Sequence, residues 1–158
     1  EKGFHDLIRA YSKIRDCGYQ LVIAGDADHE DNYSRDLKKL AADNGVILTG
    51  FIKGEPLNEV MTNAALFVLP SYHEGLPIAL LEAMSYNLDV VVSDIPANRL
   101  DSLSPEDFFH VGDIDGLARA IDSKLSQHTG ERNYDLSPYD WDNIARQTEE
   151  VYREILGD

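Results

Sequence analysis

Apolar residues recur along the chain with two periods, and the period predicts the type of each element. From Phe4 to Ile14 they recur at helical spacing, which indicates an amphipathic helix over about 4–16 that closes near Gly18. The β-rich run at about 19–24 ends at Gly25, as a buried strand would. The same signatures predict further helices at about 33–43, 57–62, 77–86, 114–125 and 141–156, and strands at about 46–49, 66–69, 90–93 and 108–111.

The order of these elements indicates the fold class. Strands that alternate with helices predict an α/β fold, with a Rossmann-like parallel sheet and helices on both faces. A length of 158 residues suits one domain, so we expect a single unit over 1–158, with a C-terminal tail helix within 139–158. Ligands of such sheets bind beyond the carboxyl ends of the strands. This rule directs attention to the loops that follow Ala24, Thr49, Leu69 and Val92.

Composition and charge narrow the class of protein. A content of 43% hydrophobic and 27% charged residues is typical of a globular protein. The longest apolar run, 64–69, is far shorter than the roughly 20 residues of a membrane-spanning helix. The net charge of −15 disfavours nucleic-acid binding, because a phosphate backbone attracts Lys and Arg. The single cysteine, Cys17, excludes an intrachain disulfide and suits a cytoplasmic protein.

The loop after Leu69 carries the strongest chemical signal. Gly75 stands just ahead of a predicted helix, where the lack of a Cβ lets a ligand approach the backbone. The first turn of a helix has N–H groups without partners and the positive end of the helix dipole, which together favour an anion. Because proline has no N–H, the expected donors around Pro77 are Gly75, Leu76 and Ile78.

Two glutamates flank this helix start. Glu82 lies within the otherwise apolar run 78–84, where a carboxylate costs several kcal/mol unless it meets a donor or solvent. It lies roughly 7 Å along the helix from the start, so Glu74 and Glu82 are spaced to hold the two ends of one diphosphate-containing ligand. Two simpler interpretations stay open. Ser71 and Glu74 also fit a helix-capping box, and Glu82 also fits a narrow solvent-facing stripe.

Other motifs are weak or missing. Asp26, Asp28 and Glu30 suggest a metal loop, but the required glycine is missing and Leu37 stands where a closing Glu belongs. We therefore expect a solvated acidic loop and no bound metal. The histidines lack metal-ligand spacing. The chain has no dinucleotide-binding glycine motif, no P-loop and no G-x-S-x-G, which argues against a nicotinamide enzyme, a P-loop ATPase and an esterase-type hydrolase.

The stretch Glu-Gly-Leu-Pro-Ile-Ala-Leu-Leu-Glu-Ala-Met at 74–84 resembles the E-x7-E signature of retaining glycosyltransferases with the two-domain GT-B fold, notably family 4 (glycosyl transferases group 1). Supporting matches cover nearly the whole chain: Glu1-Lys2-Gly3, Leu21–Gly25, Gly50-Phe51, Val91–Asp94 and Gly112-Asp113. The resemblance implies the C-terminal, donor-binding half of such an enzyme, with the N-terminal acceptor-binding domain absent from this chain. Asn87 and Asp89 depart from the Gly and Pro that are common in the family.

The resemblance also implies roles for single residues. Lys2 would contact the donor phosphates and Glu74 would position the donor sugar, so both are catalytic candidates. Glu82 would bind the ribose, and Phe51 and Ile52 would contact the nucleobase. The rest of the donor site would comprise Gly25, Gly75, Leu76, Pro77 and Ile78.

The implied activity is transfer of a hexose from a nucleotide-diphosphate sugar to a hydroxyl acceptor, with retention and without a metal or other cofactor. The acceptor, a glycan, a lipid or another hydroxyl compound, would bind through the absent domain, so this chain alone is expected to be inactive. We expect a cytoplasmic enzyme of polysaccharide or glycoconjugate biosynthesis, with peripheral attachment to the inner face of the membrane left open. Two other classes stay open: a non-catalytic nucleotide-sugar-binding module and a sugar-nucleotide epimerase of similar fold.

Overall fold

The computed structural model describes residues 1–14, 18–27, 29–127 and 132–157. Every predicted helix and strand has a counterpart in this part of the chain, and the α/β fold class is confirmed. The elements are α1 (Phe4–Lys13), β1 (Val22–Ile23), α2 (Asn32–Asp43), β2 (Ile47–Leu48), α3 (Glu55–Thr62), β3 (Phe67–Leu69), α4 (Ile78–Ser85), β4 (Val90–Ser93), β5 (Phe108–Phe109), α5 (Ile114–Ser126) and α6 (Trp141–Leu156), with the 3-10 turns η2 (Pro96–Asn98), η3 (Pro105–Asp107) and η4 (Ser137–Tyr139).

Some element boundaries differ from the prediction. The first strand is shorter than predicted, since only Val22–Ile23 pair. Pro77, predicted within the first turn of a helix, is instead the N-cap residue of α4, because its ψ of 73° is not helical. Between α5 and α6, residues 128–131 lie outside the described residues, and the segment from 132 onward runs into η4.

The strands pair in parallel, as the alternation of elements predicts. They form a two-stranded sheet, β1-β2, and a three-stranded sheet with the order β3-β4-β5. An isolated bridge joins Gly25 to Gly50 beyond the ends of β1 and β2. The central strand β4 is wholly buried, because it has helices on both sides. Its Val91 packs toward α1 and α5, whereas Val90 and Val92 pack toward α4.

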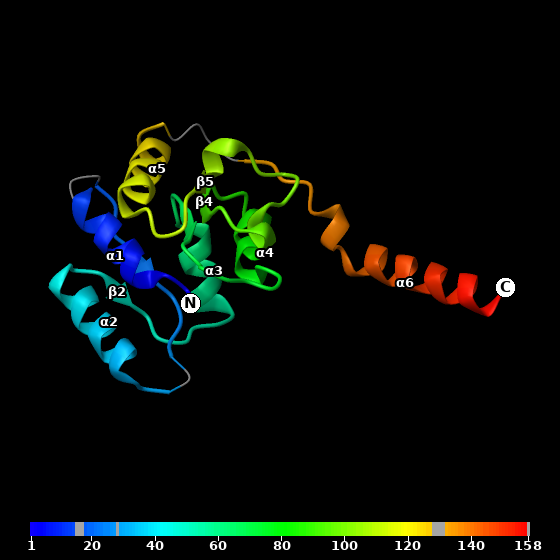
Figure 1. Ribbon diagram of the computed structural model, residues 1–158, viewed down its shortest axis with the longest axis horizontal. Helices are drawn as coiled ribbons and strands as arrows, with labels where there is room; N and C mark the ends of the chain where they lie inside the picture. Colours follow the sequence, from blue (N-terminus) through cyan, green and yellow to red (C-terminus); the bar gives the residue numbers. More distant parts are fainter. Residues whose placement is uncertain (15–17, 28, 128–131, 158) are drawn as a thin grey trace.

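The helices form layers over these sheets (Figure 1). On one side, α1 packs against both α5 and α2 and so connects the two sheets. The shared core there includes Leu7 toward α5 and Ile8 toward α2, which are neighbours in sequence but point to different clusters. On the other side, α4 packs on β3, and Ala83 joins Met61 of α3 in a smaller cluster. Because α1 packs against both α5 and α2, it lies where the two sheets meet.

The last helix, α6, projects away from the layered body (Figure 1). Asp140 caps its start by accepting hydrogen bonds from the N–H groups of Asp142 and Asn143. None of its residues is buried, although its sequence is amphipathic. The large apolar side chains that it exposes are Trp141, Val151, Tyr152, Ile155 and Leu156. Within the described part of the chain, no helix is both long and apolar enough to cross a membrane.

Candidate active site

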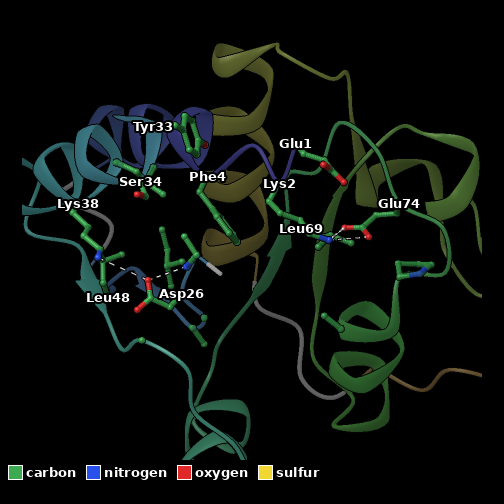
Figure 2. A pocket seen from close by; sticks show the side chains of 18 of the residues that line it. Glu1, Lys2, Phe4, Asp26, Tyr33, Ser34, Lys38, Leu48, Leu69 and Glu74 are labelled. Atoms are coloured by element: carbon green, nitrogen blue, oxygen red, sulfur yellow. Dashed lines mark hydrogen bonds and ion pairs between the residues drawn. The ribbon is translucent and has the colours of Figure 1, made fainter. Parts of the chain in front are cut away.

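A cavity of about 910 Å³ lies between the two sheets, at the carboxyl ends of their strands. Ala24 and Gly25 after β1, Gly50 after β2 and Leu69 of β3 line it, so the strand-end rule is obeyed. The start of α4 lines one side and the start of α2 the opposite side. Figure 2 shows Lys2 and Phe4 between these two sides.

The chain start is fixed against the loop that follows β3. The N–H of Tyr72 donates to the carbonyl oxygen of Glu1 over 2.8 Å. Gly3 then begins α1 in the left-handed region, with φ 69°, and a Cβ built there would collide with the carbonyl oxygen of Pro70. Only glycine meets both conditions at this position without strain. This close approach brings Lys2 beside Glu74, although 72 positions separate them in sequence.

Lys2 and Glu74 form an ion pair at the cavity (Figure 2). The Lys2 Nζ lies 3.0 Å from Oε1 and 3.1 Å from Oε2 of Glu74. The hydroxyl of Ser71 also donates to Oε1 of Glu74, over 2.6 Å. The Lys2 side chain is 53% exposed and the Glu74 side chain 10% exposed. The carboxylate is therefore held on one side, while the ammonium group keeps access to solvent and cavity.

The start of α4 offers backbone donors beside this pair. Within the described residues, the N–H groups of Gly75, Leu76 and Ala79 form no hydrogen bond. The prediction that Ile78 is a donor is wrong, because its N–H already donates to the carbonyl oxygen of Leu76 over 2.9 Å. Ala79 takes its place, since it lies in the first turn of α4 and lines the cavity. A Cβ at Gly75 would meet nothing within 4 Å, so the space over its backbone is open.

The second glutamate lies farther along α4. Glu82 is half-buried and does not line the cavity itself. It follows Ile78 and Ala79 at helical spacings of four and three, so it shares the face of α4 on which these two lining residues lie. Within the described part of the chain, no hydrogen bond or ion pair involves its carboxylate. Glu82 thus remains available to a ligand that extends beyond the cavity.

The structure also tests whether Ser71 and Glu74 form a capping box. Ser71 and Glu74 do contact each other, but side chain to side chain. Because α4 begins only at Ile78, Ser71 does not cap it, and the capping-box interpretation is excluded.

The predicted donor-site residues are only partly gathered around the cavity. Those that line it are Lys2, Gly25, Glu74, Leu76, Pro77 and Ile78. Phe51 and Ile52 follow the lining residue Gly50 but lie outside the lining, and Phe51 is exposed. Gly75 and Glu82 also lie outside it: Gly75 stands between the lining residues Glu74 and Leu76, and Glu82 lies about one helical turn beyond Ile78.

Sequence reasoning missed the wall formed by α2. Asp31 caps this helix by accepting from the N–H of Ser34, and Ser34, Leu37 and Lys38 all line the cavity. Their helical spacing was the available signal. Across from the other two, Asp26 lies 3.9 Å from the Lys38 ammonium (Figure 2). This ammonium also lies 3.5 Å from Glu30.

In its described residues, the acidic loop forms ion pairs with Lys38 through Asp26 and Glu30. No group of three His, Cys, Asp or Glu residues comes together as metal ligands among the described residues. Asp28, part of the suggested metal loop, lies outside them.

A polar cluster supports the wall next to Lys2. The hydroxyl of Tyr72 donates to Asp6 Oδ2 over 2.5 Å, and His5 Nδ1 lies 3.0 Å from the Tyr33 hydroxyl. The hydrogen bond to Asp6, together with burial, raises the pKa of Tyr72. Burial likewise raises the pKa of Tyr33. Both phenols therefore stay protonated near neutral pH and connect α1, α2 and the loop after β3 as hydrogen-bonding groups.

The sequence model of the family described as glycosyl transferases group 1 matches residues 1–149. The chain belongs to this family. The match covers the cavity and both glutamates, and it confirms the resemblance that residues 74–84 carry. All residues that line the cavity lie within the matched range.

Several glycosyltransferases are similar in sequence to this glycosyl transferases group 1 chain. An uncharacterized glycosyltransferase of Methanocaldococcus jannaschii is 34% identical, over 99% of this chain and 44% of that protein. The GDP-mannose:cellobiosyl-diphosphopolyprenol alpha-mannosyltransferase of Xanthomonas oryzae is also 34% identical, over 90% of this chain and 40% of that protein. This chain thus spans less than half the length of these relatives.

Solved structures agree with the fold. Sucrose-phosphate synthase from Thermosynechococcus elongatus matches with a TM-score of 0.74 and 22% identity, over 99% of this chain and 43% of that chain. The catalytic domain of cholesterol-alpha-glucosyltransferase from Helicobacter pylori matches with a TM-score of 0.62 and 24% identity, over 80% of each chain. At these identities the likeness concerns the fold alone, which is that of a GT-B glycosyltransferase domain.

Proposed function

We propose that this chain binds the nucleoside-diphosphate sugar of a retaining glycosyltransferase, and that the Lys2–Glu74 pair is the centre of the donor site. The observation that carries the proposal is that this pair lies beside the start of α4, at a cavity of about 910 Å³. In the part of the chain that the structure describes, the N–H groups of Gly75, Leu76 and Ala79 have no hydrogen-bond partner there. Cationic and backbone donors suit a diphosphate, and a held carboxylate suits the hydroxyls of a sugar.

The proposed chemistry is stabilisation of a leaving diphosphate. When the bond between the anomeric carbon and the phosphate oxygen breaks, negative charge grows on the diphosphate. The Lys2 ammonium and the N–H groups of Gly75, Leu76 and Ala79 are preorganised to meet this charge. The donor phosphate assists the acceptor hydroxyl on the same face of the sugar, which retains the anomeric configuration. This mechanism requires no metal, so a chelator such as EDTA should leave the rate unchanged.

The rest of the donor would extend along α4. Glu82 accepts hydrogen bonds from the ribose, and the backbone around Phe51 and Ile52 contacts the base. The Xanthomonas relative is a mannosyltransferase that uses GDP-mannose, which supports a nucleotide sugar as donor and a hexose as the transferred group. We further propose that the acceptor binds to a part of the enzyme outside this chain and that transfer takes place in the cytoplasm.

The first test is donor binding. A thermal-shift panel of UDP, GDP, ADP and their sugars should identify the base, because a ligand at 100 times its Kd stabilises the folded state by about 2.7 kcal/mol. Lys2→Ala should abolish the shift. Lys39→Ala is the matched control, because this lysine pairs with Asp43 on the exposed surface of α2. A wild-type protein that no member of the panel stabilises would contradict the proposal.

The second test is transfer by the longest polypeptide that contains this chain. Glu74→Ala and Lys2→Ala should each lower kcat by about 100- to 1,000-fold, as expected for the loss of a preorganised charged group. Near-wild-type transfer by both variants would refute the assignment. Incubation with donor but without acceptor distinguishes an epimerase, which would still convert the sugar.

A further inference from the structure

Behind Glu74 lies a row of three buried polar side chains from different parts of the chain. Ser71 follows β3, Ser93 ends β4 and Asn98 ends η2. All three are completely shielded from solvent. Buried polar groups are costly unless they are hydrogen-bonded. Each of these three side chains forms at least one hydrogen bond in the row, although Asn98 Oδ1 has no partner among the described residues.

Hydrogen bonds join this row into one chain. The Asn98 side-chain amide donates to the carbonyl oxygen of Ser93 over 3.0 Å and to its hydroxyl oxygen over 3.1 Å. The hydroxyl of Ser93 donates to the carbonyl oxygen of Ser71 over 2.5 Å. The hydroxyl of Ser71 then donates to Oε1 of Glu74 over 2.6 Å. The row therefore ends on the carboxylate that the proposed function assigns to the donor sugar.

The direction of every proton in this chain is determined. A carbonyl oxygen only accepts, so the group of Asn98 that faces the carbonyl of Ser93 must be its NH₂. Because the Ser93 hydroxyl accepts from this NH₂, its single hydrogen points to Ser71. The Ser71 hydroxyl likewise has one hydrogen, and a carboxylate oxygen is a pure acceptor for it. The arrangement has no alternative in which Ser71 turns its proton away from Glu74 without losing a buried bond.

This arrangement makes the two oxygens of Glu74 unequal. Oε1 accepts from both Ser71 and Lys2, whereas Oε2 accepts from Lys2 alone. A carboxylate oxygen has room for about two strong hydrogen bonds. The remaining acceptor capacity therefore lies on Oε2.

We propose that Ser71 is a positioning residue for the donor sugar: it occupies Oε1 and thereby directs Oε2 of Glu74 to a sugar hydroxyl. Ser93 and Asn98 support it by holding the Ser71 backbone. This inference rests on the proposed function and adds that different residues hold the sugar and the diphosphate of the donor. Among the groups of the proposed donor site, the Ser71 hydroxyl hydrogen-bonds only to Glu74, so its loss should affect the sugar more than the diphosphate that Lys2 and the α4 amides hold.

The test compares a nucleoside diphosphate with the corresponding nucleotide sugar by calorimetry on the full-length protein. The probes are UDP against UDP-glucose and GDP against GDP-mannose. In Ser71→Ala, the Kd of the nucleoside diphosphate should change by less than about twofold, while that of the nucleotide sugar weakens about tenfold, as expected for one charge-assisted hydrogen bond. Ser71→Thr, which retains the hydroxyl, should restore most of the sugar-specific affinity.

Two further variants separate positioning from folding. Ser104→Ala replaces another serine, at the N-cap of η3 and outside the hydrogen-bonded row, and should leave the affinity ratio of the two ligands unchanged. If Ser71→Ala does not fold, Ser93→Ala serves instead, because it removes the hydrogen bond to the Ser71 carbonyl oxygen. It should also weaken binding of the nucleotide sugar more than binding of the nucleoside diphosphate, by a smaller factor. Equal weakening of both ligands, or no weakening of either, overturns the role of Ser71. A wild-type protein that binds neither ligand refutes the proposed function itself.

Discussion

Two of the lysine–carboxylate clusters in this molecule are built in opposite ways. In one, Lys124 of α5 and Arg132 both contact Asp89 and Asp107. The Lys124 side chain is 11% exposed and the Asp107 side chain is fully buried. The other cluster is the Lys2–Glu74 pair, whose lysine is 53% exposed and faces the cavity.

The difference shows how the same chemistry serves stability in one place and a ligand in another. In the buried cluster, every charged group meets one of opposite sign, at 2.5 to 3.2 Å. In the open pair, the lysine has solvent on one side and the carboxylate has an oxygen with spare capacity. We therefore expect substitutions in the first cluster to affect folding and those in the second to affect binding.

The pKa shifts of the buried cluster agree with this distinction. Burial alone would raise the pKa of the Asp107 carboxyl, but hydrogen bonds from Arg132 and Lys124 outweigh it and lower the pKa. Burial would lower the pKa of Lys124, but the hydrogen bonds to Asp107 and Asp89 raise it instead. Both groups are therefore charged in the folded state.

The sharpest test applies one substitution to both clusters. Lys124→Ala should lower the free energy of unfolding by about 3 kcal/mol, because it leaves buried carboxylates with Arg132 alone. Lys2→Ala should lower it by less than about 1 kcal/mol, since an exposed charge is lost. In thermal unfolding, Lys124→Ala should lower the Tm by roughly 6 to 12 °C. Comparable shifts for the two variants would remove the distinction between the clusters.

Gly3→Ala tests the connection on which the open pair depends. The left-handed backbone and the contact with the Pro70 carbonyl should make this variant less stable by about 2 kcal/mol or more. The displaced chain start should also move Lys2 away from Glu74, so affinity for a nucleoside diphosphate should fall as well. Lys124→Ala is the comparison: it should lose more stability yet retain the affinity of its folded fraction. Unchanged affinity in Gly3→Ala would show that the approach of 1–3 to 70–72 does not position Lys2.

Acid should weaken the buried cluster specifically. Because the pKa of Asp107 is lower in the folded than in the unfolded state, the folded protein binds fewer protons in that range. This contribution to stability is present above the unfolded pKa of about 3.9 and is lost as the pH falls through the folded value. Urea midpoints between neutral pH and pH of about 3.5 should therefore fall more steeply for the wild type than for Asp107→Asn. Parallel pH profiles would be inconsistent with a lowered pKa.

The smallest effect should come from an exposed pair on α6. Arg146 and Glu150 are 2.8 Å apart and both largely exposed. Arg146→Ala should cost only about 0.3 to 0.5 kcal/mol, as is usual for a helical pair four residues apart. Chemical denaturation of Arg146→Ala and Lys124→Ala side by side measures the smallest and the largest expected loss in the free energy of unfolding. A loss as large as that of Lys124→Ala would mean that α6 has a partner in solution.

Much of this architecture could be predicted from the sequence, because local patterns encode it. The all-buried strand at 90–93 and the helix at 141–156 have the predicted bounds, since one begins with three consecutive valines and the other is amphipathic over its length. The strand near 19–24 is overestimated, because pairing depends on a neighbour that the local pattern does not contain. The prediction that the N–H of Ile78 is free for a ligand is wrong for a similar reason. In a tight turn ahead of α4, this N–H donates to the carbonyl oxygen of Leu76.

The site was predictable where residues are close in sequence and not where tertiary contacts create it. Glu74, Gly75 and Glu82 stand within one motif. The buried cluster around Asp107 was missed, because its members come from four separate segments and no spacing connects them. Ser71 was seen only as a possible cap, since its role depends on Ser93 and Asn98 at a distance in sequence.

The exposure of α6 has a practical consequence for spectroscopy. Trp141 is the only tryptophan in the chain, and it is 80% exposed in the first turn of this helix. Indole emission should therefore resemble that of free tryptophan in water whether or not the layered body is folded. A shift of the emission to shorter wavelength would instead report that something has settled on α6, which makes Trp141 a built-in fluorescent reporter of contact with this helix.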